Sequence, residues 1–90
     1  MTMMQDEAGA PLIPVRLFAA AAAAIGEEET AVPARTVAEA ITALGERTDE
    51  EGRRVLARSS VLVNSVATPD RERELGHGDR LDVLPPFAGG

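Results

Sequence analysis

The last six residues of this 90-residue sequence, Pro-Pro-Phe-Ala-Gly-Gly at positions 85–90, have types and an order that suit a chemical role. Pro85 and Pro86 hold the backbone extended, because each ring fixes φ at about −65° and the second ring disfavours helical conformations at the first. Gly89 and Gly90 have no side chain, so the end of the chain can enter a slot too narrow for any other residue. The segment is therefore suited to deliver a terminal carboxylate into the active site of another protein.

The chemical reaction that such a C-terminus can undergo is activation of its carboxylate. A carboxylate is a poor acyl donor because its leaving group is oxide, whereas an acyl-adenylate releases AMP and lets a sulfur nucleophile form a thiocarboxylate. The sequence has no Cys to act as a nucleophile and no Gly-rich phosphate-binding loop followed by Lys. We therefore expect a non-catalytic carrier that binds no cofactor itself, with activation supplied by a partner.

Two other features resemble catalytic or metal sites but have simpler explanations. His77 lies between Gly76 and Gly78 with no Ser or Cys nucleophile placed near it, so we expect an exposed turn histidine. The three consecutive glutamates at positions 27–29 could suggest a metal site. Adjacent strand residues point to opposite faces, however, so these carboxylates cannot converge on one ion if they lie in a strand. We expect a solvated sheet edge there and no metal site.

Composition limits the partners and the compartment. The net charge of −6 argues against nucleic acid or an anionic membrane and favours a basic protein surface. All nine basic residues are Arg, and the absence of Cys excludes disulfides and Cys-based metal sites. The apolar run at positions 17–25 is far shorter than the roughly 20 residues that a membrane helix needs, and the acidic start is unlike a signal peptide. We expect one small, soluble, cytoplasmic domain.

The first half of the chain predicts two strands and a short helix. Residues 12–18 alternate as a strand, with the apolar odd-numbered residues on one face and Pro14, Arg16 and Phe18 on the other. The alanines at positions 19–24 favour a short helix that ends at Gly26. Residues 27–34 would form an edge strand, in which Pro33 and the acidic run discourage pairing with other chains.

The second half predicts the main helix and the remaining strands. Thr36 and Glu39 have capping-box spacing before a helical apolar pattern, and a second, weaker helical stretch covers residues 48–57, where Gly52 lowers helix propensity. The apolar run within residues 60–64 suits a central strand buried on both sides. Asn64 and Ser65 form a turn into a short strand at residues 66–68. A charged connector at residues 69–75, which can hold one turn of helix, and a tight turn at residues 76–79 lead to the last strand.

This order of elements predicts an α+β, β-grasp fold, with a mixed sheet of about five strands and one main helix packed on one face. The first and last strands would lie side by side at the centre, so the C-terminal segment would project from the end of the sheet. We expect a flexible N-terminal tail at residues 1–11, the β-grasp domain at residues 12–84 and the extended Gly-Gly tail at residues 85–90.

The tail and parts of the domain resemble one known family. Leu84-Pro85-Pro86-Phe87-Ala88-Gly89-Gly90 is similar to the C-terminus of the MoaD/ThiS ubiquitin-like sulfur carriers, most of all to the small subunit of molybdopterin synthase. Residues 15–19 and 25–26 look like the first strand and short helix of that family, and residues 61–64 and 78–84 look like its later strands. The similarity covers roughly residues 12–90 and is strongest in the tail.

The resemblance implies a role for each residue near the C-terminus. Gly90 would carry first the adenylate and then the thiocarboxylate, and Gly89 and Ala88 would let the tail thread into a partner. The residues that would bind the partner are the docking segment and an apolar patch, at Pro85, Pro86, Phe87, Phe18 and Leu84.

The resemblance also implies partners. These are an E1-like adenylating enzyme that uses ATP, a sulfurtransferase and the large subunit of molybdopterin synthase, with which the chain would form a heterotetramer in molybdenum cofactor biosynthesis. Three alternatives remain open. The same carrier chemistry could serve thiazole, cysteine or secondary-metabolite synthesis; the chain could be a ubiquitin-like protein modifier; or it could be a non-covalent interaction module.

Overall fold

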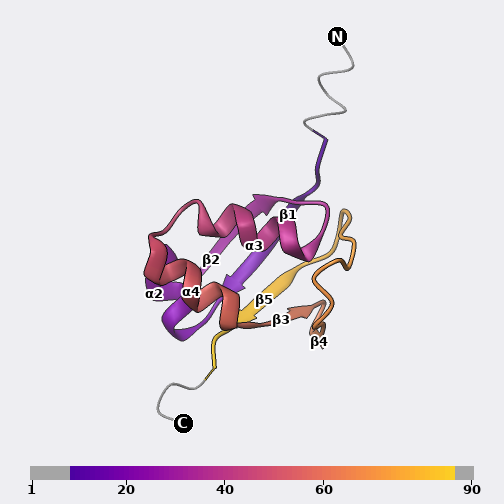
Figure 1. Cartoon of the computed structure of the whole chain (residues 1–90). Helices are drawn as coiled ribbons and strands as arrows, with labels where there is room; N and C mark the ends of the chain where they lie inside the picture. Colours follow the sequence, from indigo (N-terminus) through magenta and orange to yellow (C-terminus); the bar gives the residue numbers. More distant parts are fainter. Residues whose placement is uncertain (1–8, 87–90) are drawn as a thin grey trace.

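A computed structural model describes residues 9–86 as a five-stranded sheet with three helices (Figure 1). In chain order the elements are β1 (Leu12–Leu17), α2 (Ala19–Ile25), β2 (Glu29–Pro33), α3 (Val37–Gly45), α4 (Glu50–Arg58), β3 (Ser60–Val63), β4 (Val66–Ala67) and β5 (Leu81–Leu84). The sheet order is β2-β1-β5-β3-β4, with β1 and β5 parallel and the other neighbours antiparallel. The prediction that the first and last strands lie side by side is confirmed.

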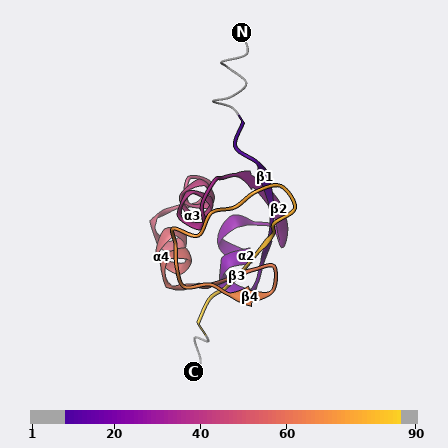
Figure 2. The same ribbon diagram turned by 90° about the vertical axis from the view of Figure 1, so that its right-hand side faces the viewer.

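The helices cover one face of the sheet, as the view in Figure 2 shows for α3 and α4. The alternation predicted for β1 is confirmed, since Ile13, Val15 and Leu17 are buried while Pro14 and Arg16 are exposed. The core between the helices and the sheet consists of Ile13, Val15, Leu17, Ala21, Val32, Ala34, Val37, Ala40, Leu44, Leu56, Val61, Val63, Leu75, Leu81 and Val83. We call the sheet face opposite this core the open face.

Local signals place the helix ends as the sequence predicts. Gly26 adopts φ +87° after α2 and donates its N–H to the Ala22 carbonyl at 2.7 Å, which is the expected glycine C-cap. Thr36 caps α3 by accepting the Glu39 N–H at 3.1 Å. The Glu39 carboxylate reaches back to the N–H of Arg35 at 2.7 Å, one residue before the position that a standard capping box would use.

Helix α4 forms close to where the sequence predicts a helix, at Glu50–Arg58 against the predicted residues 48–57. It has nine residues, as α3 does, although Gly52 lowers its propensity. Asp49 compensates by accepting the Gly52 N–H at 2.9 Å as the N-cap. Gly52 is buried, and a Cβ there would overlap the Thr48 side chain, so glycine is the residue that lets this turn close.

Strand β3 and the connector after β4 differ from the prediction. Val61 and Val63 are buried, but Leu62 points to the open face and is only half-buried, because the helices cover the other face. The connector at residues 69–75 forms a turn and a single bridge between Glu74 and Thr36, with no helix. Among residues 9–86, no helix is long and apolar enough to cross a membrane.

Candidate functional site

The structure brings together the predicted site residues that it describes. Phe87, Ala88, Gly89 and Gly90 lie outside the described residues. Phe18 follows the end of β1, and its N–H donates to the Val83 carbonyl of β5 at 3.2 Å. Because β1 and β5 are parallel and pair Leu17 with Val83, Phe18 comes beside Leu84, where the tail begins.

The tail leaves the sheet directly from its central strand. Leu84 and Pro85 are half-buried and Pro86 is exposed, so the chain emerges from the core within three residues. Phe18 is 39% exposed, which is high for an aromatic side chain beside a sheet. Leu84, Pro85 and Phe18 therefore form one apolar surface at the end of the sheet from which the tail departs.

The backbone after Phe18 keeps this ring out of the core. Phe18 is the N-cap of α2 with an extended backbone at φ −122°, and its side chain makes no capping bond. Ala19 then adopts φ +50°, a left-handed conformation that is uncommon for any residue except glycine. This sharp change of direction lets α2 turn onto the helical face while Phe18 stays on the open face.

An ion pair lies next to Phe18 on the open face. Arg16 of β1 pairs in register with Asp82 of β5, and its Nε donates to Asp82 Oδ1 at 3.2 Å. Asp82 is only 6% exposed, whereas the Arg16 side chain is 54% exposed. The Arg16 guanidinium also lies over the Phe18 ring, 5.8 Å from its centroid, within the range of a cation–π contact.

Acidic residues border the same surface. A shallow hollow of about 310 Å³ lies between α2 and the start of β2, and Arg16, Phe18, Glu28 and Glu29 line part of it. Glu28 and Glu29 are exposed, as the sequence predicts for a solvated edge. Within residues 9–86, no group of three or more acidic or histidine side chains is arranged to hold a metal ion.

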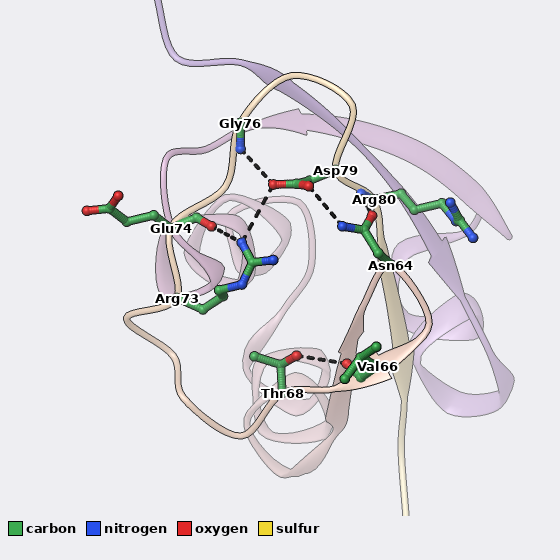
Figure 3. Close-up of polar contacts among 8 residues, drawn as sticks. All are labelled: Asn64, Val66, Thr68, Arg73, Glu74, Gly76, Asp79 and Arg80. Atoms are coloured by element: carbon green, nitrogen blue, oxygen red, sulfur yellow. Dashed lines mark hydrogen bonds and ion pairs between the residues drawn. The ribbon is translucent and has the colours of Figure 1, made fainter.

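The opposite end of β5 is fixed by a cluster that sequence analysis missed (Figure 3). Asp79 accepts hydrogen bonds from the Asn64 side chain and the Gly76 N–H, both at 2.9 Å, and pairs with Arg73 at 3.7 Å. Asn64 also exchanges hydrogen bonds with the backbone of Arg80 at 3.0 Å. The pKa of Asp79 lies below its ordinary value. The hydrogen bond from Asn64 is the largest cause of this lowering, and the bond from Gly76 is the next largest.

This cluster positions the site from a distance. It joins the β3–β4 turn to the residues before β5 and so fixes the register of the strand that leads to the tail. The signals in the sequence were the Asn-Ser turn and the Gly-His-Gly-Asp turn, each of which was predicted separately. His77 is exposed in its turn, as predicted.

Comparison with known proteins identifies the family. The model of the ThiS family matches residues 15–90, which is most of the chain and includes the Gly-Gly end. This chain belongs to the ThiS family. The recognition made from the sequence is confirmed, and the chain is a member of the MoaD/ThiS ubiquitin-like sulfur carriers. No curated protein matches the sequence.

Solved structures confirm the ubiquitin-like β-grasp fold of this ThiS-family chain. SAMP1 from Haloferax volcanii is 27% identical with a TM-score of 0.74, covering 88% of this chain and 99% of its own. A second match is the protein–protein complex of subunits 1 and 2 of the molybdopterin-converting factor from Helicobacter pylori 26695. The identity is 26% and the TM-score 0.64, with 88% of this chain and 99% of that chain covered.

A third similar structure is also a complex. The BexX/CysO complex of Amycolatopsis orientalis matches at 25% identity and a TM-score of 0.70, with 87% of this chain and 99% of that chain covered. Two of these three similar structures thus contain a partner protein. They support a partner protein for the ThiS-family chain as well.

Proposed function

We propose that this protein is a sulfur carrier whose Gly90 carboxylate is adenylated and then converted to a thiocarboxylate. The observation that carries the proposal is the match to the ThiS family, which extends through the Gly-Gly end. The fold supports it, because the tail leaves the central strand β5 beside an exposed apolar surface. The chain would act as the non-catalytic subunit of a sulfur-transfer system.

The proposed chemistry has two steps at Gly90. In the first, an oxygen of the carboxylate attacks the α-phosphorus of ATP in an E1-like adenylating enzyme, which forms the acyl-adenylate and releases pyrophosphate. In the second, hydrosulfide supplied by a sulfurtransferase system attacks the acyl carbon. The carbon–oxygen bond to AMP breaks, AMP leaves with the electron pair, and the thiocarboxylic acid loses its proton. The protein supplies no group to either step except the tail itself.

Docking of the activating partner would use the open face at the end where the tail departs. Phe18 and Leu84 provide the apolar contact, and Pro85, Pro86 and Phe87 guide the tail, while Gly89 and Ala88 allow it to thread. Glu28 and Glu29 border this surface, and the net charge of the chain is −6. A partner with basic side chains around an apolar pocket is therefore the best match.

Molybdenum cofactor biosynthesis is the pathway that we favour. The tail sequence and the similarity to the Helicobacter pylori complex support the small subunit of molybdopterin synthase, with a large subunit as the second partner in a heterotetramer. The similarity to CysO keeps sulfur delivery to another pathway, such as thiazole, cysteine or secondary-metabolite synthesis, as an alternative.

A protein modifier is the second candidate function. It is favoured by the similarity to SAMP1, whose name stands for small archaeal modifier protein 1. In this role the activated Gly90 would form an amide with an amine of a target protein. Conjugates of high molecular weight on a denaturing gel, lost when Gly90 is deleted, would favour this candidate over the carrier.

The decisive experiment is the intact mass of the protein purified from its own cells under non-reducing conditions. We expect a form shifted by a single oxygen-to-sulfur exchange that disappears when Gly90 is deleted. If only the carboxylate is found, even after incubation with ATP, cell extract and a sulfur donor, the carrier proposal is wrong. If the sulfur-bearing form is found, transfer of its sulfur to a purified molybdopterin synthase large subunit with its pterin precursor separates the pathways.

A further inference from the structure

Asp82 is a buried carboxylate in an unexpected place. It lies on the open face in the central strand β5, beside Leu62 of β3, yet it is only 6% exposed. Burying a charge is costly unless a partner compensates. The partner is Arg16, whose Nε donates to Asp82 Oδ1 at 3.2 Å from the neighbouring strand. A buried ion pair is weak evidence for a stabilising role, because apolar residues often serve as well in such a position.

What the pair does is fix the guanidinium of Arg16. The carboxylate binds Nε, which sets the orientation of the planar group, and Arg16 remains 54% exposed on its outer side. From this position the guanidinium lies over the Phe18 ring at 5.8 Å from the centroid. Phe18 directly follows the end of β1 and keeps an extended backbone, so it shares the open face with Arg16, two residues earlier. The contacts therefore run from the buried Asp82 through Arg16 to Phe18.

We propose that Asp82 and Arg16 are positioning residues that hold the Phe18 ring in one orientation for docking of the adenylating partner. This inference rests on the proposed function, and it adds the contacts that orient the aromatic ring of the docking surface. An exposed aromatic side chain samples several rotamers. A partner that binds only one of them must overcome the conformational entropy that the side chain loses on binding. A ring already held by the guanidinium avoids that cost, which raises affinity without any added contact to the partner.

The test measures ATP–pyrophosphate exchange by the adenylating enzyme of the same organism, with this protein as the varied substrate. The variant combines Arg16→Met with Asp82→Leu, so that no buried charge is left unpaired and the fold is kept. We expect its KM to rise about two- to tenfold, the range of the cost of ordering one side chain. We expect kcat to stay the same, because Gly90 is unchanged. The control Arg54→Met, which removes an exposed arginine paired with glutamates on α4, should leave both constants unchanged.

A double-mutant comparison separates positioning of Phe18 from a direct contact of Arg16 with the partner. In a Phe18→Ala background the Arg16→Met and Asp82→Leu pair should have no further effect on KM, because the ring that it orients is gone. An effect of full size in that background would overturn the proposal. It would mean that Arg16 acts on the partner directly.

A second readout needs no partner. Three-bond couplings measured by NMR report the χ1 populations of Phe18, and we expect one dominant rotamer in the wild type and averaging in the Arg16→Met, Asp82→Leu variant. Equal averaging in both proteins would contradict the proposal, whatever the exchange assay gives. If the wild type shows one rotamer but is not adenylated, the proposed function fails while the positioning of Phe18 stands.

Discussion

Asp79 is the carboxylate on which the register of β5 depends, and its removal gives the sharpest test of the fold. It accepts hydrogen bonds from Asn64 and Gly76 at 2.9 Å and pairs with Arg73 at 3.7 Å. A hydrogen bond to a charged group contributes about 1.5–3 kcal/mol, and the remaining 22% exposure of the side chain reduces this through solvent screening. We expect Asp79→Ala to lower the free energy of unfolding by about 2 kcal/mol.

Thermal unfolding followed by circular dichroism measures this loss. For a domain of this size, about 2 kcal/mol corresponds to a decrease in Tm of about 8–16 °C. The matched control is Asp70→Ala, because exposed Asp70 accepts a hydrogen bond from the Glu72 N–H within its own turn. The control should change stability by only about 0.5 kcal/mol. Equal losses for the two variants would refute the role assigned to Asp79.

The pH dependence supplies an independent check. The bonds from Asn64 and Gly76, with a smaller effect of Arg73, lower the pKa of Asp79 from its ordinary value of 3.8. A carboxyl group with a lowered pKa in the folded state stabilises the protein above its unfolded pKa, and the contribution is lost as pH falls through the folded pKa. The difference between wild type and Asp79→Ala should be full at neutral pH and should narrow below about pH 4. A difference that stays constant into acid would contradict this account.

Four further predictions address the turn, the tail and the docking surface. Ser65→Gly should stabilise the protein by about 0.5–1 kcal/mol in urea unfolding, because Ser65 adopts φ +73° in the β3–β4 turn, where glycine is less strained; unchanged or lower stability would contradict this. Gly89→Val should abolish sulfur transfer with an unchanged Tm, and transfer at the native rate would rule out threading of the tail. Phe87→Ala should instead weaken partner binding by about 1–3 kcal/mol in calorimetry, as expected for a buried aromatic ring. Glu28→Lys with Glu29→Lys should weaken partner binding and reduce its dependence on salt, whereas an unchanged salt dependence would exclude a basic partner surface at this position.

The sequence predicts those parts of the fold that depend on near neighbours. The alternation in β1, the cap at Thr36 and the glycine after α2 follow from residues within one turn or one strand, and all three are confirmed. A helix at residues 48–57 is also predicted, and α4 forms at Glu50–Arg58, where the local cap at Asp49 compensates for the low helix propensity of Gly52.

The contacts that prepare the site could not be predicted in this way. Arg16 and Asp82 are 66 residues apart, and although the first and last strands are predicted to be neighbours, the register that pairs these two residues is seen only in the structure. The hydrogen-bonded cluster around Asp79 likewise joins two turns that are separate in the sequence. In both cases the sequence contains the polar residue, but the residue with which it pairs depends on how the strands and turns are arranged in the fold.

The parallel pairing of β1 and β5 would also link the proposed docking surface to the proposed chemistry in this small protein. Two parallel neighbours end at the same edge of the sheet, so Phe18 and the start of the tail lie together although they are distant in the sequence. The six residues after Leu84 can span at most about 20 Å. In the proposed function, an adenylating partner that holds Phe18 would have its active site within about 20 Å of Leu84. In the proposed function, a partner that holds both ends of this short segment would receive the carboxylate at a high effective concentration, with no catalytic group required from this chain.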